Sequence, residues 1–187
     1  MPELIISDIM MPKMRGDELC EILKNDIETS HIPIILLTAL NDEKHVVQGL
    51  RMGADEYIIK PFYISILKAT IANILNNRAI LRSKYANLEI EETAEEACNN
   101  CSTDIDWKFI AELKIQGEAN IEDPNFNIDI LAADMNMSRT SLYNKIKALT
   151  DLSPSDYVRN IKLTKAAELL KEGKLNVTEV AERTGFS

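Results

Sequence analysis

Three short apolar runs alternate with helical patterns in the first part of the chain, and this alternation constrains its fold most. The runs are "LIIS" (4–7), "IPIILLT" (32–38) and "YIIK" (57–60). Apolar runs without polar alternation are typical of strands that are covered on both faces. Strands that alternate with helices predict an α/β domain with a parallel sheet.

Between and after these runs, apolar residues recur at helical spacing. One pattern covers residues 16–26, a second covers 42–53, and a third extends from about residue 64 to about 85. The first pattern places three apolar residues on one predicted face: Leu19, Ile22 and Leu23.

Charge and composition separate the chain into unlike parts. Residues 1–124 hold 12 Lys and Arg against 22 Asp and Glu, a net charge of −10, whereas residues 125–187 hold 9 against 8, a net charge of +1. Nucleic-acid binding depends on local potential, so the second part remains a candidate despite the total of −9. No apolar run approaches membrane-spanning length, and the start lacks a signal-peptide pattern, which predicts a cytoplasmic protein without membrane contact.

Residues 88–106 are acidic and poor in large apolar residues, which predicts a linker. The segment contains Cys98 and Cys101 in a single CxxC pattern. One such pair without a second is weak evidence for a metal site, so coincidence within a linker is the favoured interpretation. The predicted domains are therefore 1–87 and 107–187, joined by this linker.

The second part is helical and contains a repeat. "NIDILAADMNMS" (127–138) and "NVTEVAERTGFS" (176–187) align without gaps at an offset of 49 residues. Each copy resembles the first helix and turn of a helix-turn-helix, and Asn136 and Gly185 occupy the turn position that needs positive φ.

The first copy continues into "SRTSLYNKIKAL" (138–149), a predicted recognition helix with Ser138 as N-cap. Leu142, Ile146 and Leu149 are expected to face inward. Five residues remain for the outer face: Arg139, Thr140, Tyr143, Asn144 and Lys147. A third helix, predicted between Ser153 and Gly173, would be a rod of roughly 28 Å that can hold two recognition helices about one DNA turn apart.

Several of these motifs together resemble two known families. "SDIMMP", "LLTA" and "GADEYIIKPF" resemble the receiver domain of two-component response regulators, over residues 2–80. "SRTSLYNKIKALTDLSPSDYVRNIKL" is similar to the AraC/XylS-type DNA-binding domain, over residues 107–187. The order resembles the C-terminal end of the hybrid two-component regulators of Bacteroidetes. It implies a partial, doubly wound (flavodoxin-like) receiver followed by an all-α helix-turn-helix domain.

The receiver resemblance assigns roles at the ends of the three strands. It makes Asp8 the phospho-acceptor, with Lys60 pairing one phosphoryl oxygen and Thr38 hydrogen-bonding another. It also makes Tyr57 the switch aromatic and the Met10 backbone carbonyl a ligand of Mg²⁺. The bond between Lys60 and the following proline resembles the cis peptide of the family.

The resemblance further implies that the chain opens at the receiver's third strand and stops before the second recognition helix. An acidic pair that completes the Mg²⁺ site would then lie outside it, so Mg²⁺ binding and phosphorylation of the 187-residue chain are expected to be weak. Its first strand would leave an apolar edge that invites self-association, including a homodimer.

The favoured function is a DNA-binding transcription regulator controlled by aspartyl phosphorylation, with a histidine kinase and double-stranded DNA as partners and no enzymatic activity of its own. One alternative is a phosphohydrolase with Asp8 as nucleophile. It is disfavoured because the next acid, Asp17, is nine positions away. The other alternative is a module that binds protein through its helical part.

Overall fold

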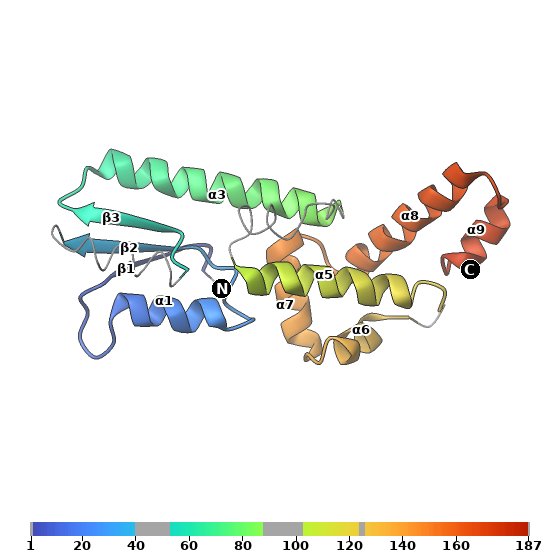
Figure 1. Ribbon diagram of the computed structural model, residues 1–187, viewed down its shortest axis with the longest axis horizontal. Helices are drawn as coiled ribbons and strands as arrows, with labels where there is room; N and C mark the ends of the chain where they lie inside the picture. The colour runs from blue at the N-terminus through green and yellow to red at the C-terminus, as the bar shows by residue number, and fades with distance from the viewer. Residues whose placement is uncertain (1, 40–52, 88–102, 124–125, 187) are drawn as a thin grey trace. The chain divides into compact units, whose positions relative to one another are not determined.

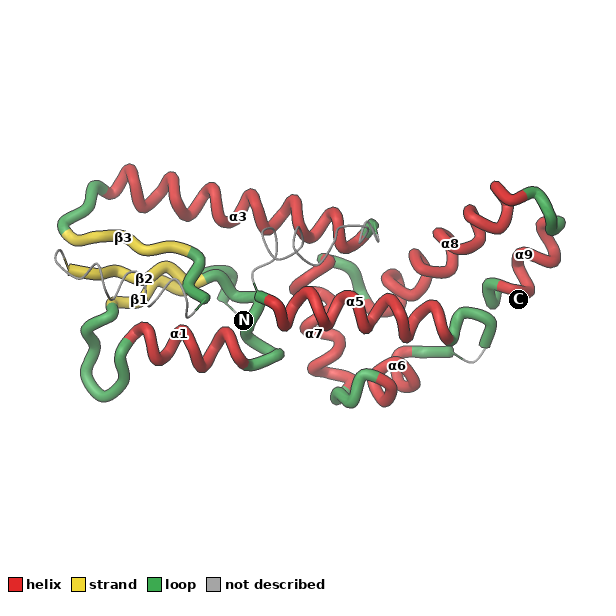
Figure 2. Tube along the Cα trace, viewed as in Figure 1, coloured by secondary structure: helices red, strands yellow, loops and turns green. Residues whose placement is uncertain are grey.

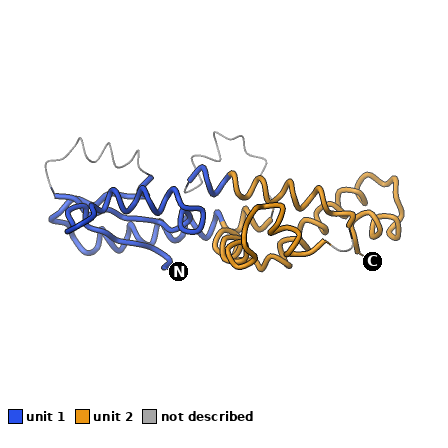
Figure 3. Tube along the Cα trace, turned by 90° about the horizontal axis from the view of Figure 1, so that it is seen from below, with its two compact units in different colours: residues 1–81, 94–107 blue, residues 82–93, 108–187 orange. Residues whose placement is uncertain are grey.

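The computed structural model describes residues 2–39, 53–87, 103–123 and 126–186. The chain forms two compact units (Figure 3). The sheet unit comprises residues 1–81 and 94–107, and the helical unit comprises 82–93 and 108–187. The domain limits predicted from the sequence, at 87/88 and 106/107, stay a prediction.

The sheet unit contains three parallel strands, β1 (Ile5–Asp8), β2 (Ile34–Ala39) and β3 (Glu56–Lys60), in the order β1-β2-β3 (Figure 2). The three apolar runs predicted this parallel sheet correctly. The central strand β2 is buried over most of its length, which explains why its sequence shows no polar alternation.

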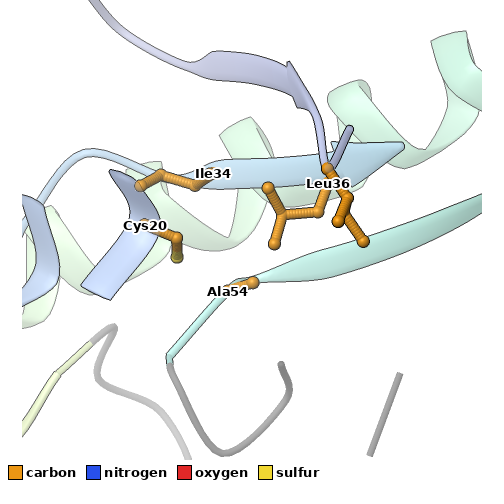
Figure 4. Close-up of a cluster of buried hydrophobic side chains, with 5 residues drawn as sticks. Cys20, Ile34, Leu36 and Ala54 are labelled. Carbon is orange, nitrogen blue, oxygen red and sulfur yellow. The ribbon is translucent and has the colours of Figure 1, made fainter. Parts of the chain in front are cut away.

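Helices α1 (Gly16–Asn25) and α3 (Ile64–Ala86) lie on opposite sides of the sheet (Figure 1). The core on the α1 side is a cluster of buried side chains from α1, from β2 and from the loops that follow β1 and precede β3 (Figure 4): Ile9, Cys20, Ile34, Leu36 and Ala54. Burial of these apolar groups is the main force that holds α1 on the sheet.

The prediction that Leu19, Ile22 and Leu23 form the apolar face of α1 is partly wrong. Ile22 is 54% exposed, whereas Cys20 is fully buried and Lys24 is 4% exposed. Lys24 is buried because its Nζ donates to Asp55, 2.7 Å away, and this pairing lets a charged residue lie on the inner face. The helix predicted over 42–53 lies outside the described residues, apart from Gly53.

The helical unit is built from α5 (Asp104–Ala119) from residue 108 onward, α6 (Ile128–Asp134), α7 (Arg139–Thr150), α8 (Pro154–Glu172) and α9 (Val177–Arg183), with the last residues of α3. Its buried side chains come from all five helices and include Ile110, Leu131, Leu142, Tyr157 and Val180. None of the helices in the described part of the chain is long and apolar enough to cross a membrane.

The described end of the predicted linker is helical. Asp104–Asp106 form the first turn of α5, and Thr103 Oγ1 accepts a hydrogen bond from the Asp106 amide at 3.2 Å. Acidic residues suit this position because the helix dipole stabilises negative charge at the N-terminus. Cys98 and Cys101 lie outside the described residues.

Both copies of the repeat fold as the sequence predicts. Asn127 and Asn176 cap α6 and α9 through their side chains. The two turn residues have positive φ, 53° at Asn136 and 63° at Gly185. Each copy also has a hydrogen bond of 2.9 Å that closes the turn. The Met137 amide donates to the Ala132 carbonyl, and the Phe186 amide donates to the Ala181 carbonyl.

Candidate functional site

The three strands end at the same edge of the sheet and bring the predicted receiver residues there. Asp8 is the last residue of β1 and lies opposite Leu37 of β2. Lys60 is the last residue of β3 and lies opposite Ala39, next to Thr38. Sheet edges of this kind are open to solvent at the carboxyl ends of the strands, where the following loops begin.

Asp8 and Lys60 form an ion pair across the end of β2. Lys60 Nζ donates to Asp8 Oδ2, while the backbone amide of Met10 donates to Asp8 Oδ1 at 3.2 Å. The hydrogen bond from Lys60 and, after it, that from Met10 lower the pKa of the Asp8 carboxyl from its usual value, so it is ionised at neutral pH. The Asp8 and Lys60 side chains are 38% and 41% exposed, so this carboxylate is accessible from solvent.

Thr38 and Tyr57 are less directly connected to Asp8. Thr38 is 4% exposed, and its hydroxyl donates to the Ala39 carbonyl at 3.4 Å. Tyr57 packs against the apolar cluster under α1, and its buried hydroxyl has no hydrogen-bond partner among the described residues. Burial raises the pKa of that hydroxyl. The Lys60–Pro61 peptide bond is cis, as predicted.

The loop after Asp8 returns closely to the strand, and Gly16 makes this return possible. The Gly16 amide donates to the Ile9 carbonyl at 3.0 Å. A Cβ atom at position 16 would lie 2.2 Å from the backbone oxygen of Asp8. Only a residue without a side chain fits this approach, so Gly16 helps to fix the backbone of the candidate acceptor.

The outer face of α7 carries the five residues predicted for DNA. Arg139, Thr140, Tyr143, Asn144 and Lys147 are all exposed. Leu142, Ile146 and Leu149 are buried on the opposite face, as expected. Lys145, which lies on the same basic segment, is 1% exposed and so does not belong to the outer face.

The two cations of this outer face are each bound by an acid. Arg139 Nη1 lies 3.2 Å from Asp129 Oδ1, and Lys147 Nζ lies 3.1 Å from Asp151 Oδ1. These acids were not predicted as part of the interface.

The comparisons with known proteins match these two regions separately. Residues 1–72 match the model of the response regulator receiver domain, and residues 131–187 match that of an AraC-type helix-turn-helix domain. The chain joins a receiver domain to a helix-turn-helix domain. The family resemblance noted in the sequence is therefore confirmed for both parts.

Similar proteins include both kinases and regulators. Histidine kinase P4 of Formosa agariphila is 38% identical over 186 residues, which is 100% of this chain and 13% of that protein. The phosphate regulon transcriptional regulatory protein PhoB of Rhizobium meliloti is 44% identical over 75 residues, covering 40% of this chain and 33% of that protein. This chain thus spans a minor part of the length of both relatives.

Among solved structures, the signal receiver domain of a signal transduction histidine kinase from Syntrophus aciditrophicus is 43% identical. The similarity covers 41% of this chain and 58% of that one, with a TM-score of 0.38.

The receiver residues that are described do not complete a magnesium site. No group of three or more His, Cys, Asp or Glu side chains that could hold a metal occurs in the described ranges. The two oxygens of Asp8 already accept hydrogen bonds from Lys60 and from the Met10 amide. Octahedral Mg²⁺ needs oxygen ligands beyond this single carboxylate and one backbone carbonyl.

Sequence reasoning missed Gly16 and the acids Asp129 and Asp151. A glycine at the predicted start of a helix was the available signal for Gly16, because glycine is a poor helix former and suits a close backbone approach. Asp129 gave no local signal, since it meets Arg139 across ten residues and a turn. Asp151 did give one, because it follows Lys147 by four residues, the spacing of helical ion pairs.

Proposed function

We propose that this chain is the output part of a two-component phosphorelay. Asp8 accepts a phosphoryl group from a histidine kinase, and the helical unit binds double-stranded DNA, so that phosphorylation controls transcription. The observation that carries this proposal is the exposed, ionised carboxylate of Asp8 held by Lys60 at the ends of parallel strands.

The chemistry needs a carboxylate nucleophile and a cation beside it. An Asp8 oxygen forms a bond to phosphorus as the phosphorus–nitrogen bond of a phosphohistidine breaks, and the leaving imidazole takes up a proton. Lys60 then neutralises charge on the phosphoryl group, and the Thr38 hydroxyl donates to another of its oxygens. Thr38 must turn from the Ala39 carbonyl to do so, and Tyr57 would follow as the switch residue.

Mg²⁺ is expected to assist this reaction, because receiver domains generally bind it. Asp8 and the Met10 carbonyl would be its ligands in this chain.

The exposed face of α7 is proposed to enter the major groove of DNA. Arg139, Thr140, Tyr143 and Asn144 would reach base edges, and Lys147, one turn later, would contact a phosphate. Helix α8 has the 19 residues that the sequence predicted for the rod between two helix-turn-helix motifs.

The alternatives have less support. In a phosphohydrolase a second carboxylate would assist Asp8, but Asp17 is bound by Arg15 at 3.0 Å, and that contact lowers its pKa. A protein-binding module would explain the exposed face of α7 but not the repeated helix-turn-helix pattern.

The direct test is phosphorylation with a small donor such as phosphoramidate, with and without Mg²⁺, located by mass spectrometry. The chain should be compared with a version extended by the first strand and acidic pair of receiver domains. We expect weak labelling at Asp8 in the chain itself and strong labelling in the extended version. Asp8→Asn should abolish labelling in both, and undiminished labelling of that variant would exclude Asp8 as the acceptor.

A further inference from the structure

The two cations on the outer face of α7 are not available to DNA without competition. Arg139 has Asp129 as its polar partner among the described residues, with Nη1 at 3.2 Å and 3.4 Å from the two carboxylate oxygens. Lys147 Nζ contacts the Asp151 carboxylate at 3.1 Å and also donates to the Asp151 backbone carbonyl at 2.6 Å. Each cation that DNA would attract is therefore already bound to an anion of the same unit.

Both acids are fixed in place by the helix ends on which they lie. Asp129 is in the first turn of α6, where its amide donates to the capping side chain of Asn127 at 2.8 Å. Asp151 is the C-cap of α7, with φ of 60° and its amide bonded to the Lys147 carbonyl. Because the backbone holds both residues, their carboxylates stay within reach of the cations.

We propose that Asp129 and Asp151 are affinity-limiting residues that compete with DNA for Arg139 and Lys147. This inference rests on the proposed DNA binding by α7. Each acid lowers the affinity by occupying a cation that must be released before DNA can bind it, and each adds a negative charge where the phosphates of DNA approach.

The expected effect is modest because the pairs are exposed. The side chains of Arg139 and Asp129 are 68% and 64% exposed, and such pairs are weak in water. We expect Asp129→Asn to raise DNA affinity about two- to fivefold at low salt. Asp151→Asn should have a smaller effect, because the backbone carbonyl of residue 151 still accepts from Lys147.

The second copy of the repeat lacks this restraint. The residue that corresponds to Asp129 at the offset of 49 is Thr178, which carries no charge. An acid at this position is thus a feature of the first copy and not of the repeat.

The experiment uses the whole chain and a short fluorescent duplex of random sequence. Anisotropy titrations at several salt concentrations, from about 50 to 200 mM, give the affinity and the salt slope. The single variants are Asp129→Asn, Asp151→Asn, Arg139→Ala and Lys147→Ala. The double variant combines Asp129→Asn with Arg139→Ala. Glu168→Gln is the matched control, because Glu168 pairs with Lys165 at 3.1 Å on α8 and its loss changes the net charge equally.

We expect Asp129→Asn to raise affinity and to steepen the salt slope by about one. On a duplex of random sequence, Arg139 can then neutralise one more phosphate, which releases one more counterion from the DNA. Both gains should disappear in the Arg139→Ala background, and Glu168→Gln should give neither. A gain that persists without Arg139, or one that Glu168→Gln reproduces, would show a general charge effect and overturn the competition. A lower affinity of Asp129→Asn would instead make Asp129 a positioning residue for Arg139.

The same titrations separate this inference from the proposed function. If Arg139→Ala and Lys147→Ala both leave affinity and salt slope unchanged, α7 does not face DNA, and both proposals fail. If these two variants weaken binding while Asp129→Asn changes nothing, only the competition is wrong.

Discussion

Asp8 and Lys60 come from the ends of two different strands, whereas Arg139 and Asp129 come from the first turns of two short consecutive helices. Under the proposed function, the acid of the sheet unit is the reacting group and a cation holds it. The cations of the helical unit are the binding groups, and acids hold them.

The two units differ in what supports these pairs. Beneath the sheet, Asp55 joins Lys24, Arg78 and the backbone of β2 in a partly buried network, at 2.7 Å, 3.2 Å and 2.8 Å. The pairs on α7 are supported by helix caps at the surface. A change in this network is therefore expected to affect the sheet unit as a whole, whereas the α7 pairs can be changed one by one.

The largest expected effect comes from breaking the buried network. Asp55→Ala leaves Lys24, which is 4% exposed, without this carboxylate, and should destabilise the sheet unit by about 3–5 kcal/mol. Hydrogen exchange of the β2 amides measures this loss. Asp129→Ala should cost the helical unit less than about 1 kcal/mol, and equal losses at the two positions would contradict the comparison.

A smaller effect is expected where the acceptor loop meets the strand. Gly16→Ala places a Cβ against the Asp8 backbone oxygen and should cost about 1–3 kcal/mol, with a shifted carboxyl resonance of Asp8. Gly173→Ala is the control, because nothing lies within 4 Å of its Cβ although its φ is 67°. That variant should lower stability through backbone strain and leave the Asp8 resonance in place. An unmoved resonance in Gly16→Ala would mean that the close approach does not position Asp8.

The smallest effect concerns the exposed ion pair between Asp8 and Lys60. Lys60→Met removes the main cause of the lowered pKa of Asp8, so the pKa should rise towards its usual value, as carbon-detected NMR titration of the carboxyl would show. The stabilisation from a lowered carboxyl pKa is present above the unfolded-state pKa and is lost as pH falls through the folded-state value. Lys60→Met should therefore lose less stability than the wild type on acidification. An unchanged Asp8 pKa would show that Lys60 does not bind it in solution.

Much of the fold could be predicted because its signals are local. The apolar runs predicted the strands, and Ser153 with Pro154 and Gly173 predicted both ends of α8. The positive φ at Asn136 and Gly185 followed from residue type and turn position alone.

The errors arose where distant residues decide the environment. Ile22 fits a helical apolar pattern but is exposed, whereas Lys24 is buried because Asp55, 31 residues away, binds it. Asp129 was missed for a related reason, because the pattern of α7 alone does not show what the neighbouring helix α6 brings to Arg139. Asp151, four residues after Lys147, could have been predicted from its spacing.

The most direct test of the central claim joins the two units in one measurement. Affinity for a random-sequence duplex should be measured before and after treatment with phosphoramidate and Mg²⁺, in the wild type and in Asp8→Asn, using the extended version with its labelling verified by mass spectrometry. We predict that phosphorylation changes the DNA affinity of the wild type and leaves that of Asp8→Asn unchanged. An unchanged affinity in fully labelled wild type, or the same change in Asp8→Asn, would contradict control of DNA binding through Asp8.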